Sequence, residues 1–370
     1  MLSVGIIGLP NVGKSTLFNA VTAAAANVSN YPFTTIDSNV GVVAVPDSRL
    51  LRLQEVLKPR ESTPCFVQFI DIAGLVEGAS QGEGLGNQFL GNIRQVDALA
   101  HVVRCFQDPN VSHVLEDVNP VRDVKIVEAE LLLADRQVLE GAVEKRKRIW
   151  QTSPAEHAKE KQRWALYQEK LESGVPLRNL TLDREDRREL KGLGLLTGKP
   201  VIYVANLSEE EYLESENWLA QELAENAIWQ AAPKPPEVVS VTARFEWELQ
   251  QLEAGEQSEF MKELKMTQTG LERLVQKAFQ ALGLITFYTI ANEKLQAWEV
   301  EEGATAPDAA GKVHSDMQQG FIRAEVVSVP DLSQHGSFAE LARLGLVHSQ
   351  GKEYIVDDGD VIHFLFKDTN

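Results

Sequence analysis

The first two thirds of the chain alternate short apolar runs with segments of helical periodicity. Residues 65–70, 99–105, 200–205 and 237–241 are apolar enough to form buried strands, and a similar run at 2–7 precedes them. Strands that alternate with helices are typical of a doubly wound, mostly parallel sheet with helices on its faces. The pattern therefore predicts the α/β fold class for this part of the chain.

A long charged insertion separates the second and third of these four strands. Its first apolar stripe steps by three or four residues, as in a coiled-coil seam, and comprises Val124, Val127, Leu131, Ala134, Val138 and Ala142. A second stripe, which we interpret as core, comprises Trp164, Tyr167 and Leu171. Ser153, with a proline after it and Glu156 three positions later, predicts a new helix start. We expect residues 120–195 to form an inserted helical hairpin, or coiled-coil arm.

The pattern changes again after residue 283. Strand-like runs lie at Leu284–Ile290, Ile322–Val327, Glu353–Val356 and Val361–Phe366, and residues 303–311 are small and turn-rich. Several short strands with one helix predict a C-terminal β-grasp module.

The composition narrows the class of protein. The 370 residues are enough for two or three domains, and 44% of them are hydrophobic, as in globular proteins. No apolar run approaches the roughly 20 residues of a membrane span, so we expect no membrane partner. The only cysteines, Cys65 and Cys105, cannot form a disulfide framework, which fits a reducing cytoplasm. We also expect no presequence, because the strand at 2–7 belongs to the fold.

Charge is distributed unevenly. The net charge of −18 makes the whole chain a poor match to nucleic acid, and we expect no sequence-specific binding to DNA. Residues 141–200, however, hold 14 Lys and Arg against 9 Asp and Glu. This segment indicates either a local anionic partner or a solvated helix face.

Residues 8–15 read Gly-Leu-Pro-Asn-Val-Gly-Lys-Ser, the G-x-x-x-x-G-K-S pattern of a phosphate-binding loop. The loop follows the strand at 2–7 and precedes a helical run, as the motif requires. Lys14 is expected to bridge the β- and γ-phosphates and Ser15 to bind Mg²⁺. The predicted phosphate-site residues are Asn11, Val12, Gly13, Lys14, Ser15 and Thr16.

Two further elements of a GTPase-like P-loop domain follow in order. Residues 31–37 offer Thr34 and Thr35 as ligands of Mg²⁺, and we favour Thr35. The strand at 65–70 ends in Asp71-Ile-Ala-Gly74, where Asp71 would hold Mg²⁺ through water and the Gly74 N–H would sense the γ-phosphate. Together with Lys14, Thr35 and Gly74 are the predicted catalytic residues.

Leu75 stands where Ras-type GTPases place a glutamine that orients the attacking water. Leucine cannot form that hydrogen bond, so hydrolysis is either slow or supported by another group. One hypothesis is that Asn11 binds K⁺ beside the phosphates, where the added charge would stabilise the transition state. The alternative is that Asn11 only braces the loop.

Asn206-Leu207-Ser208-Glu209 occupies the place of the guanine-reading Asn-Lys-x-Asp. Glu209 is one methylene longer than the aspartate, and Leu207 replaces the lysine, so the fit to guanine is weakened. The Asn206 amide can donate to the imidazole-ring nitrogen and accept from an exocyclic amine, which adenine permits. Ser240, at the end of the next apolar run, is expected to line the base, and Ser208 with Glu211 fits a helix-capping box.

Several longer motifs make the chain resemble the YchF/Obg-like ATPase family of translation-factor-class P-loop NTPases. They lie at Gly41–Asp47, Asp71–Val76, 78–96, His101–Phe106, Asn206–Glu209 and His314–Val326, which span the chain nearly end to end. The resemblance implies ATP as the nucleotide and slow ATP hydrolysis. It also implies a role at the ribosome or its rRNA and a TGS domain at the C-terminus.

The resemblance also implies three parts. These are a P-loop NTPase domain at 1–119 and 196–282, the arm at 120–195, and the TGS domain at 283–367. A basic arm could contact rRNA phosphates, or it could be a rigid spacer or protein-docking surface. The oligomeric state stays open, and a monomer is assumed.

The TGS domain departs from the family pattern. Arg343–Ser349 and Leu365 are apolar where relatives carry basic residues, which leaves Phe321 and Arg323 as expected contacts of that domain. Two further readings stay open beside the ATPase switch. One is a GTPase, and the other is a binding module in which nucleotide acts only as an allosteric ligand.

Overall fold

The computed structural model describes residues 2–26, 39–72, 85–115, 117–214, 218–230, 232–264 and 266–367. The chain forms two compact units. The first combines Met1–Val43 with Gln68–Ala278, and the second combines Ala44–Val67 with Phe279–Asn370. The sequence analysis assigned all of 1–119 to the nucleotide domain, whereas the structure groups 44–67 with the C-terminal part.

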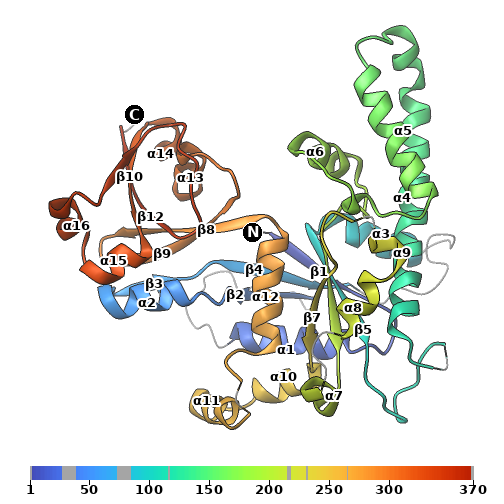
Figure 1. The fold of residues 1–370 in the computed structure, drawn as a ribbon, viewed down its shortest axis with the longest axis horizontal. Helices are drawn as coiled ribbons and strands as arrows, with labels where there is room; N and C mark the ends of the chain where they lie inside the picture. Colours follow the sequence, from blue (N-terminus) through green and yellow to red (C-terminus); the bar gives the residue numbers. More distant parts are fainter. Residues whose placement is uncertain are drawn as a thin grey trace. The chain divides into compact units, whose positions relative to one another are not determined.

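The first unit is built around a six-stranded sheet in the order β2-β4-β1-β5-β6-β7 (Figure 1). Its strands are β1 (Ser3–Ile7), β2 (Val40–Ala44), β4 (Phe66–Asp71), β5 (Ala98–Arg104), β6 (Val201–Asn206) and β7 (Glu237–Val241). Neighbours from β4 to β7 run parallel, and β1, β5 and β6 are buried along their whole length. The sequence-based α/β assignment is therefore confirmed.

Helices follow most of these strands in the first unit. They are α1 (Lys14–Ala26), α3 (Leu85–Gln95), α4 (Pro120–Thr152), α5 (Ala158–Glu172), the 3₁₀ helix η1 (Leu177–Asn179), α6 (Arg184–Leu193), α7 (Glu209–Glu214), α8 (Trp218–Ala224), α9 (Ala227–Gln230), α10 (Ala243–Leu249), α11 (Ala254–Glu263) and α12 (Gly270–Ala281). Among the helices in the described segments, none has the length and apolar character that a membrane span needs.

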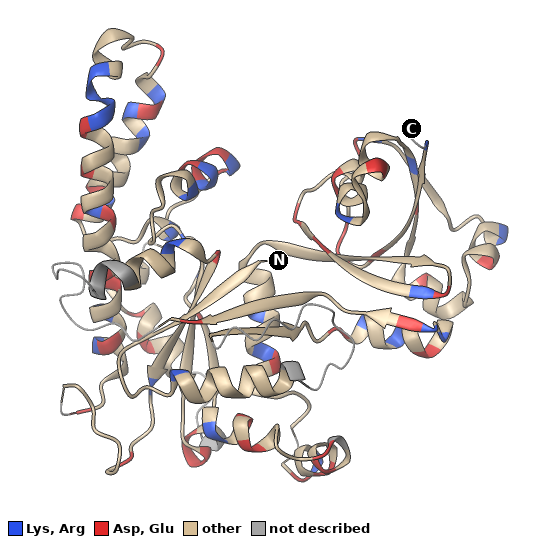
Figure 2. Ribbon diagram, turned by 180° about the vertical axis from the view of Figure 1, so that it is seen from behind, with Lys and Arg blue, Asp and Glu red and all other residues tan. Residues whose placement is uncertain are grey.

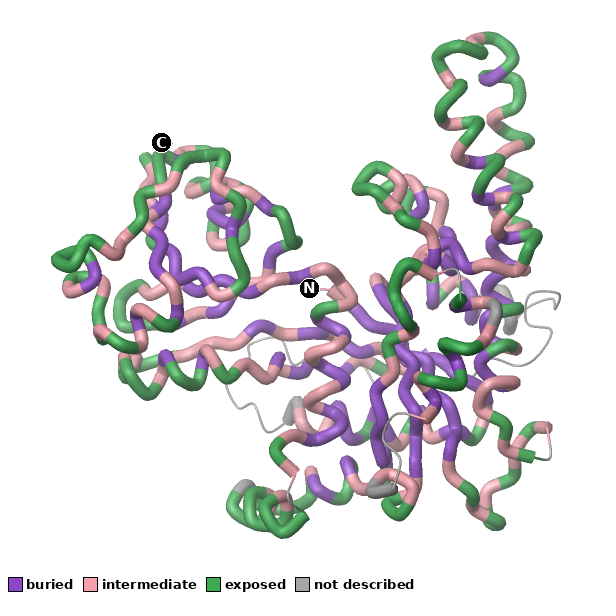
Figure 3. The backbone as a smooth tube through the Cα atoms, viewed as in Figure 1, coloured by how far each residue is buried: buried purple, intermediate pink, exposed green. Residues whose placement is uncertain are grey.

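Helices α4 and α5 pack side by side as a helical arm (Figures 1 and 3). Trp164, Tyr167 and Leu171 are buried in its core, as predicted. The rings of Trp150 and Trp164 pack edge to face, with 5.3 Å between their centroids. The predicted helix start at Ser153 is wrong. The Ser153 N–H bonds the Ile149 carbonyl and so closes α4, and α5 begins only at Ala158.

The root of the arm is attached to the sheet through buried polar groups. Glu128 of α4 is paired with Arg178 and accepts a 2.7 Å hydrogen bond from the Tyr203 hydroxyl on β6. Further along α4, the Asp135 carboxylate accepts hydrogen bonds of 2.7 Å from the backbone N–H groups of Leu196 and Thr197. These contacts satisfy charges that would otherwise be costly to bury, and they fix α4 against the chain that returns from the arm.

The second unit contains a sheet in the order β11-β10-β12-β8-β9-β3. Its strands are β3 (Glu61–Thr63), β8 (Leu284–Ala291), β9 (Lys294–Glu301), β10 (Phe321–Ser328), β11 (His348–Gln350) and β12 (Asp360–Phe366). Its helices are α2 (Ser48–Leu57), α13 (Ala306–Val313), α14 (Ser315–Gln319), α15 (Val329–His335) and α16 (Phe338–Leu344). Ion pairing of Arg49 with Asp358 at 2.8 Å and the hydrogen bond from Tyr288 to Asp47 attach residues 44–67 to this unit.

Three expectations for the C-terminal part are wrong. Residues 303–311 are not mainly turns, because a capping box between Thr305 and Asp308 starts helix α13. Residues 353–356 form no strand beyond an isolated bridge at Ile355. Phe321 is 5% exposed and packs in the core of the unit, so it cannot be a surface contact.

Candidate nucleotide site

The phosphate loop connects β1 to the first residue of α1. Gly8, Asn11 and Gly13 have φ angles of 147°, 61° and 97°, which curl the backbone toward the start of the helix. A Cβ on Gly8 would lie 2.4 Å from the Val102 carbonyl oxygen, so only glycine fits there. Such a loop at a helix N-terminus is a ready-made site for a phosphate group, because its backbone N–H groups are free to bind an anion.

Lys14 and Asp71 lie together beside this loop. Ile6 of β1 is in register with Asp71 of β4, which brings the end of β4 to the start of the loop. The Lys14 side chain is buried, and its Nζ donates to the Leu9 carbonyl at 2.7 Å. Burial lowers the pKa of Lys14 to about 8, and the Asp71 charge partly opposes this shift.

The Asp71 carboxylate has capacity for a further ligand. Its Oδ1 is buried without a hydrogen-bond partner among the described residues. Burial raises the pKa of Asp71, and the charge of Lys14 opposes that change. A buried carboxylate oxygen without a donor is suited to a hydrated divalent cation, so this arrangement fits the magnesium ion that a phosphate loop implies.

Asn206 links three segments at the carboxyl end of the sheet. Its Nδ2 donates to the Val12 carbonyl at 2.9 Å, and its Oδ1 accepts from the Ala243 N–H at 3.0 Å. Its backbone carbonyl accepts from the Cys105 N–H at 2.9 Å. One side-chain N–H and one lone pair remain for a ligand. The amide therefore holds the loops together, a role that the sequence analysis did not assign to it.

The rest of the predicted base site is divided between the core and the surface. Leu207 is 2% exposed, and its N–H bonds the Val241 carbonyl at 2.9 Å. Ser240 is also buried, and its carbonyl accepts from Arg273. Glu209 is exposed at the first position of α7. The predicted capping box is confirmed, since Ser208 and Glu211 exchange side-chain and backbone hydrogen bonds.

Sequence comparisons agree with this architecture. Residues 3–136 match a family model described as "50S ribosome-binding GTPase". Residues 284–367 match the model YchF-GTPase_C, described as "Protein of unknown function (DUF933)". The chain is 45% identical to the "Ribosome-binding ATPase YchF" of Bacillus subtilis, over 99% of both chains. The chain belongs to the YchF family.

Other YchF proteins support the same assignment. The protein of that name from Escherichia coli O157:H7 is 42% identical over 98% of both chains. A solved structure titled "Structure of the Schizosaccharomyces pombe YchF GTPase" matches 98% of this chain and 97% of its own, with 34% identity and a TM-score of 0.85. The names of these proteins state different nucleotides, because the bacterial proteins are called ATPases and the yeast protein is called a GTPase.

The sequence analysis also named Thr34, Thr35, Gly74 and Leu75, which lie outside the described residues. Ser15 is exposed and Thr16 partly exposed in the first turn of α1.

The sequence analysis missed the loop that follows β5. Arg104 is 2% exposed, and its guanidinium donates to the carbonyls of Phe106 and Asp108, each at 3.2 Å. Asn11 Nδ2 donates to the Ser112 carbonyl at 3.2 Å, which is a bracing contact for the phosphate loop. The sequence analysis used His101–Phe106 only as a motif of the family. An arginine at the end of an apolar strand is usually exposed, so nothing in the sequence indicated that Arg104 is buried.

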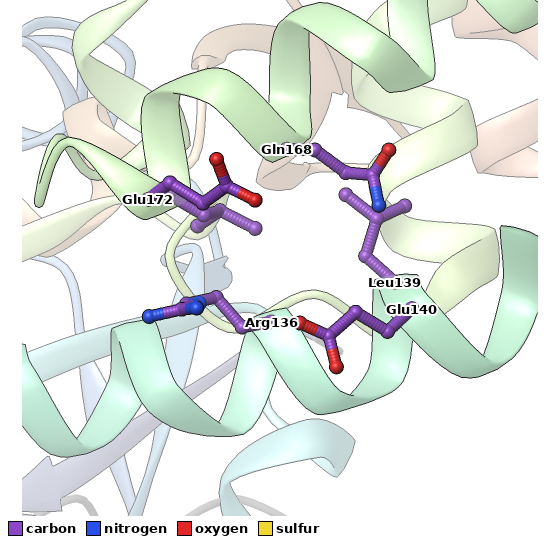
Figure 4. Close-up of a pocket in the computed structure, with 6 residues that line it drawn as sticks. Arg136, Leu139, Glu140, Gln168 and Glu172 are labelled. Carbon is purple, nitrogen blue, oxygen red and sulfur yellow. The ribbon is translucent and has the colours of Figure 1, made fainter.

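A small open cavity lies in the arm, away from the phosphate loop. It is lined by Arg136, Leu139, Glu140, Gln168, Leu171 and Glu172 of α4 and α5 (Figure 4). Its charged side chains are at least partly exposed, and its floor is apolar. We assign no ligand to it.

Proposed function

We propose that this YchF-family chain is a cytoplasmic P-loop switch that binds ATP and slowly hydrolyses its β–γ phosphoanhydride. The observation that carries the proposal is the position of Lys14 and Asp71 beside the phosphate loop, with an Asp71 carboxylate oxygen that no donor among the described residues uses. The bacterial relatives from Bacillus subtilis and Escherichia coli O157:H7, which match nearly the whole chain, are named ATPases. The alternatives are a GTPase and a nucleotide-gated binding module.

The phosphate side of the site would work as follows. Lys14 holds the β- and γ-phosphates, and the N–H groups of residues 11–16 surround the β-phosphate. Ser15 and Asp71, the latter through water, hold Mg²⁺, which supplies positive charge to the phosphates when bound. The Lys14 side chain is already held toward the loop by the Leu9 carbonyl, so little ordering is needed on binding.

Adenine is favoured on the base side because two guanine-reading groups are missing. Leu207 cannot act like the lysine of a GTPase, because it has no amino group and its side chain is buried. Glu209 has a longer side chain than the aspartate that pairs with guanine, and it starts a helix at the surface. The free N–H and lone pair of Asn206 are compatible with adenine. Ser240 lies opposite Ala205 in the pairing of β6 with β7, next to the end of the strand that carries Asn206, and its carbonyl accepts from Arg273.

Hydrolysis is expected to be slow because Leu75 cannot orient water. Thr35 and Gly74 would sense the γ-phosphate. We keep the hypothesis that the Asn11 side-chain oxygen binds K⁺, since only its Nδ2 is used by Ser112. ATP turnover should then be faster in KCl than in NaCl. Asn11→Gly, which tolerates the positive φ, should remove the difference. Equal rates in the two salts would reject this role.

The proposed partner is the ribosome, and the arm is the proposed contact. Lys145–Arg148 near the end of α4 form a basic run, in which Arg146 pairs with Glu160 and Lys147 with Glu144. Lys145 and Arg148 are exposed and have no ion pair within the described residues. The C-terminal unit, proposed to be a TGS domain, offers Arg323, whose side chain pairs only weakly with Glu325 at 3.5 Å.

Titration calorimetry with ATP and GTP, in K⁺ with Mg²⁺, tests the nucleotide. ATP should bind at least about tenfold more tightly, which corresponds to about 1.4 kcal/mol. Glu209→Asp should narrow the gap, and Glu210→Asp, the neighbouring exposed glutamate, is the matched control. Leu207→Lys is unsuitable because it buries a charge. GTP binding as tight as ATP binding would make the chain a GTPase, and ATP binding without turnover would favour the binding module.

A further inference from the structure

Arg104 is the only Lys or Arg in the six strands that form the sheet of the first unit. Figure 2 shows that the charged residues of this unit lie mainly on its helices and loops, while its strands carry few of them. The Arg104 side chain is buried, and no carboxylate in the described part of the chain forms an ion pair with it. Burying a charge without a counter-charge is costly, so other polar groups must hold the guanidinium.

Those groups are carbonyl oxygens of residues 106–112, which we call the β5 loop. The guanidinium donates to the Phe106 and Asp108 carbonyls, each at 3.2 Å, and makes a longer contact of 3.5 Å with the Ser112 carbonyl. The Phe106 ring covers it, with 4.5 Å between Cζ and the ring centroid. All three acceptors are main-chain atoms, so the arginine binds the shape of this loop and not a particular side chain.

The β5 loop has few other means of keeping that shape. It contains no regular helix or strand, and most of its residues are exposed. A turn forms within it, because the Asp108 carbonyl accepts a 3.2 Å hydrogen bond from the Val111 N–H. Since Arg104 binds the same carbonyl, it anchors the turn that leads directly to Ser112.

The Ser112 carbonyl connects the β5 loop to the phosphate loop. It accepts a 3.2 Å hydrogen bond from Asn11 Nδ2, and the Asn11 side chain has no other partner among the residues that the structure describes. The Asn11 backbone has a φ of 61°. Asparagine adopts this left-handed conformation more readily than most residues, but it still costs free energy. The bond to Ser112 therefore helps to select the conformation in which the phosphate loop curls.

We propose that Arg104 is a positioning residue for the nucleotide site. It shapes the β5 loop so that the Ser112 carbonyl holds Asn11 in the conformation that binds phosphate. The inference rests on the proposed nucleotide binding. Strand β5 is a suitable place for such a residue, because it lies between β1, which leads into the phosphate loop, and β6, where Arg104 is in register with Asn206. A site that is preorganised in this way loses less free energy when it binds its ligand.

The alternative is that Arg104 only stabilises the fold at the end of β5. The two roles differ in whether Arg104 acts through Asn11. A residue that only stabilises the fold changes nucleotide affinity by the same factor with or without the Asn11 side chain. Residues that are linked through one hydrogen-bond network have non-additive effects.

The test is a double-mutant cycle of Arg104→Lys and Asn11→Gly, measured on the full chain by titration calorimetry with ATP and Mg²⁺. Lysine keeps the positive charge but lacks the planar fork that reaches several carbonyls. We expect Arg104→Lys to weaken ATP binding at least about fivefold when Asn11 is present, and less than about twofold in the Asn11→Gly background. Gln107→Ala, which removes an exposed side chain of the same loop, is the control and should bind ATP like the wild type.

A nuclear magnetic resonance signal tests the same link without nucleotide. The side-chain amide of Asn11 is identified as the signal that is missing from the spectrum of Asn11→Gly. In Arg104→Lys we expect this signal to move toward the position of exposed asparagine amides, and in Gln107→Ala it should stay in place. The signal reports the hydrogen bond itself, so it distinguishes positioning from a general loss of stability.

The outcomes separate this inference from the proposed function. Equal factors in the two backgrounds, or no effect of Arg104→Lys, would overturn the positioning role even if the wild type binds ATP. If the wild type binds only GTP, the same cycle is measured with GTP. If it binds neither nucleotide, the proposed function is wrong, and the Asn11 signal alone decides whether Arg104 positions the loop.

A second variant keeps the test possible if Arg104→Lys does not fold. The Asp108 side chain accepts a 2.8 Å hydrogen bond from the Asn110 N–H, so Asp108→Ala loosens the turn without changing the buried arginine. We expect it to weaken ATP binding less than Arg104→Lys does, and again only when Asn11 is present. An effect of equal size in the Asn11→Gly background would contradict the proposed link.

Discussion

Asn206 Nδ2 donates a hydrogen bond of 2.9 Å to the Val12 carbonyl oxygen, although 194 positions separate the two residues. The bond connects the end of β6 to the phosphate loop, and the second bond of the amide, to the Ala243 N–H, extends this connection to α10. The base loop and the phosphate loop are therefore held in one arrangement before any nucleotide binds.

Replacing Asn206 by alanine should weaken the fold and the nucleotide site together. The change leaves the Val12 carbonyl and the Ala243 N–H without partners, and each such group costs about 1–3 kcal/mol when buried. We expect a lower melting temperature without nucleotide and weaker ATP binding by calorimetry. Asn206→Asp is a harsher comparison, because it keeps an acceptor for Ala243 but replaces the donor to Val12 with a buried carboxylate oxygen that faces the Val12 carbonyl. An alanine variant that melts like the wild type would contradict this role.

Gly13→Ala should abolish nucleotide binding by a steric effect. A Cβ at this position would lie 2.3 Å from Asn206 Nδ2, and the φ of 97° is strained for alanine. Asn206 would have to leave Val12, and the loop would change shape. Gly141→Ala is the matched control, since no atom lies within 4 Å of its Cβ position in α4. Calorimetry should show ATP binding in the control only, and binding by both variants would show that the loop can adapt.

Breaking the buried ion pair between Arg178 and Glu128 at the root of the arm should lower the free energy of unfolding. Arg178→Met leaves the Glu128 carboxylate with only the Tyr203 hydroxyl, and its Oε2 already lacks a partner. Removing one member of a buried ion pair usually costs about 3–5 kcal/mol. Adding Glu128→Gln should recover a large part of this loss in the double variant. Urea unfolding of the four proteins measures the coupling, and additive effects would mean that the pair is not energetically linked.

The sequence was sufficient where a local pattern determines the structure. The parallel strands and the phosphate loop follow from apolar runs and from G-x-x-x-x-G-K-S, and the structure has both. The contacts of Asn206 could not be predicted, because they depend on how the base loop and the phosphate loop come together. Arg104 was missed for a similar reason, since its buried position is determined by the carbonyls of the loop that follows.

The sequence also could not predict short polar strands or the separation of opposite charges onto two faces of one helix. Strand β3 has three polar residues and no apolar alternation, yet it pairs with β9, which places residues 44–67 in the second unit. The positive charges on one face of α6 and the negative charges on the other nearly cancel when the charges of the helix are summed. Only the contacts of Arg163, Trp164 and Tyr167 show which face is used by the arm.

Glu246 is a buried carboxylate whose protonation should affect stability near neutral pH. Its Oε1 accepts a 2.7 Å hydrogen bond from the Gly270 N–H at the start of α12, while its Oε2 is buried and has no hydrogen-bond partner in the described part of the chain. Burial raises the pKa of Glu246 from 4.5 to about 7, and the nearby charge of Glu272 adds to the effect. The folded protein therefore holds this proton more tightly than the unfolded chain does.

The stability contributed by protonated Glu246 should be complete below pH 4.5 and should be lost as the pH rises through about 7. The difference between the two pKa values corresponds to about 3 kcal/mol. Glu246→Gln keeps an oxygen acceptor for Gly270 and cannot ionise, so it should gain stability relative to the wild type as the pH rises from 5 to about 8. Glu248→Gln, exposed on the same helix, is the control. Urea unfolding across this pH range is the measurement, and parallel pH profiles for wild type and Glu246→Gln would mean that Glu246 does not titrate there.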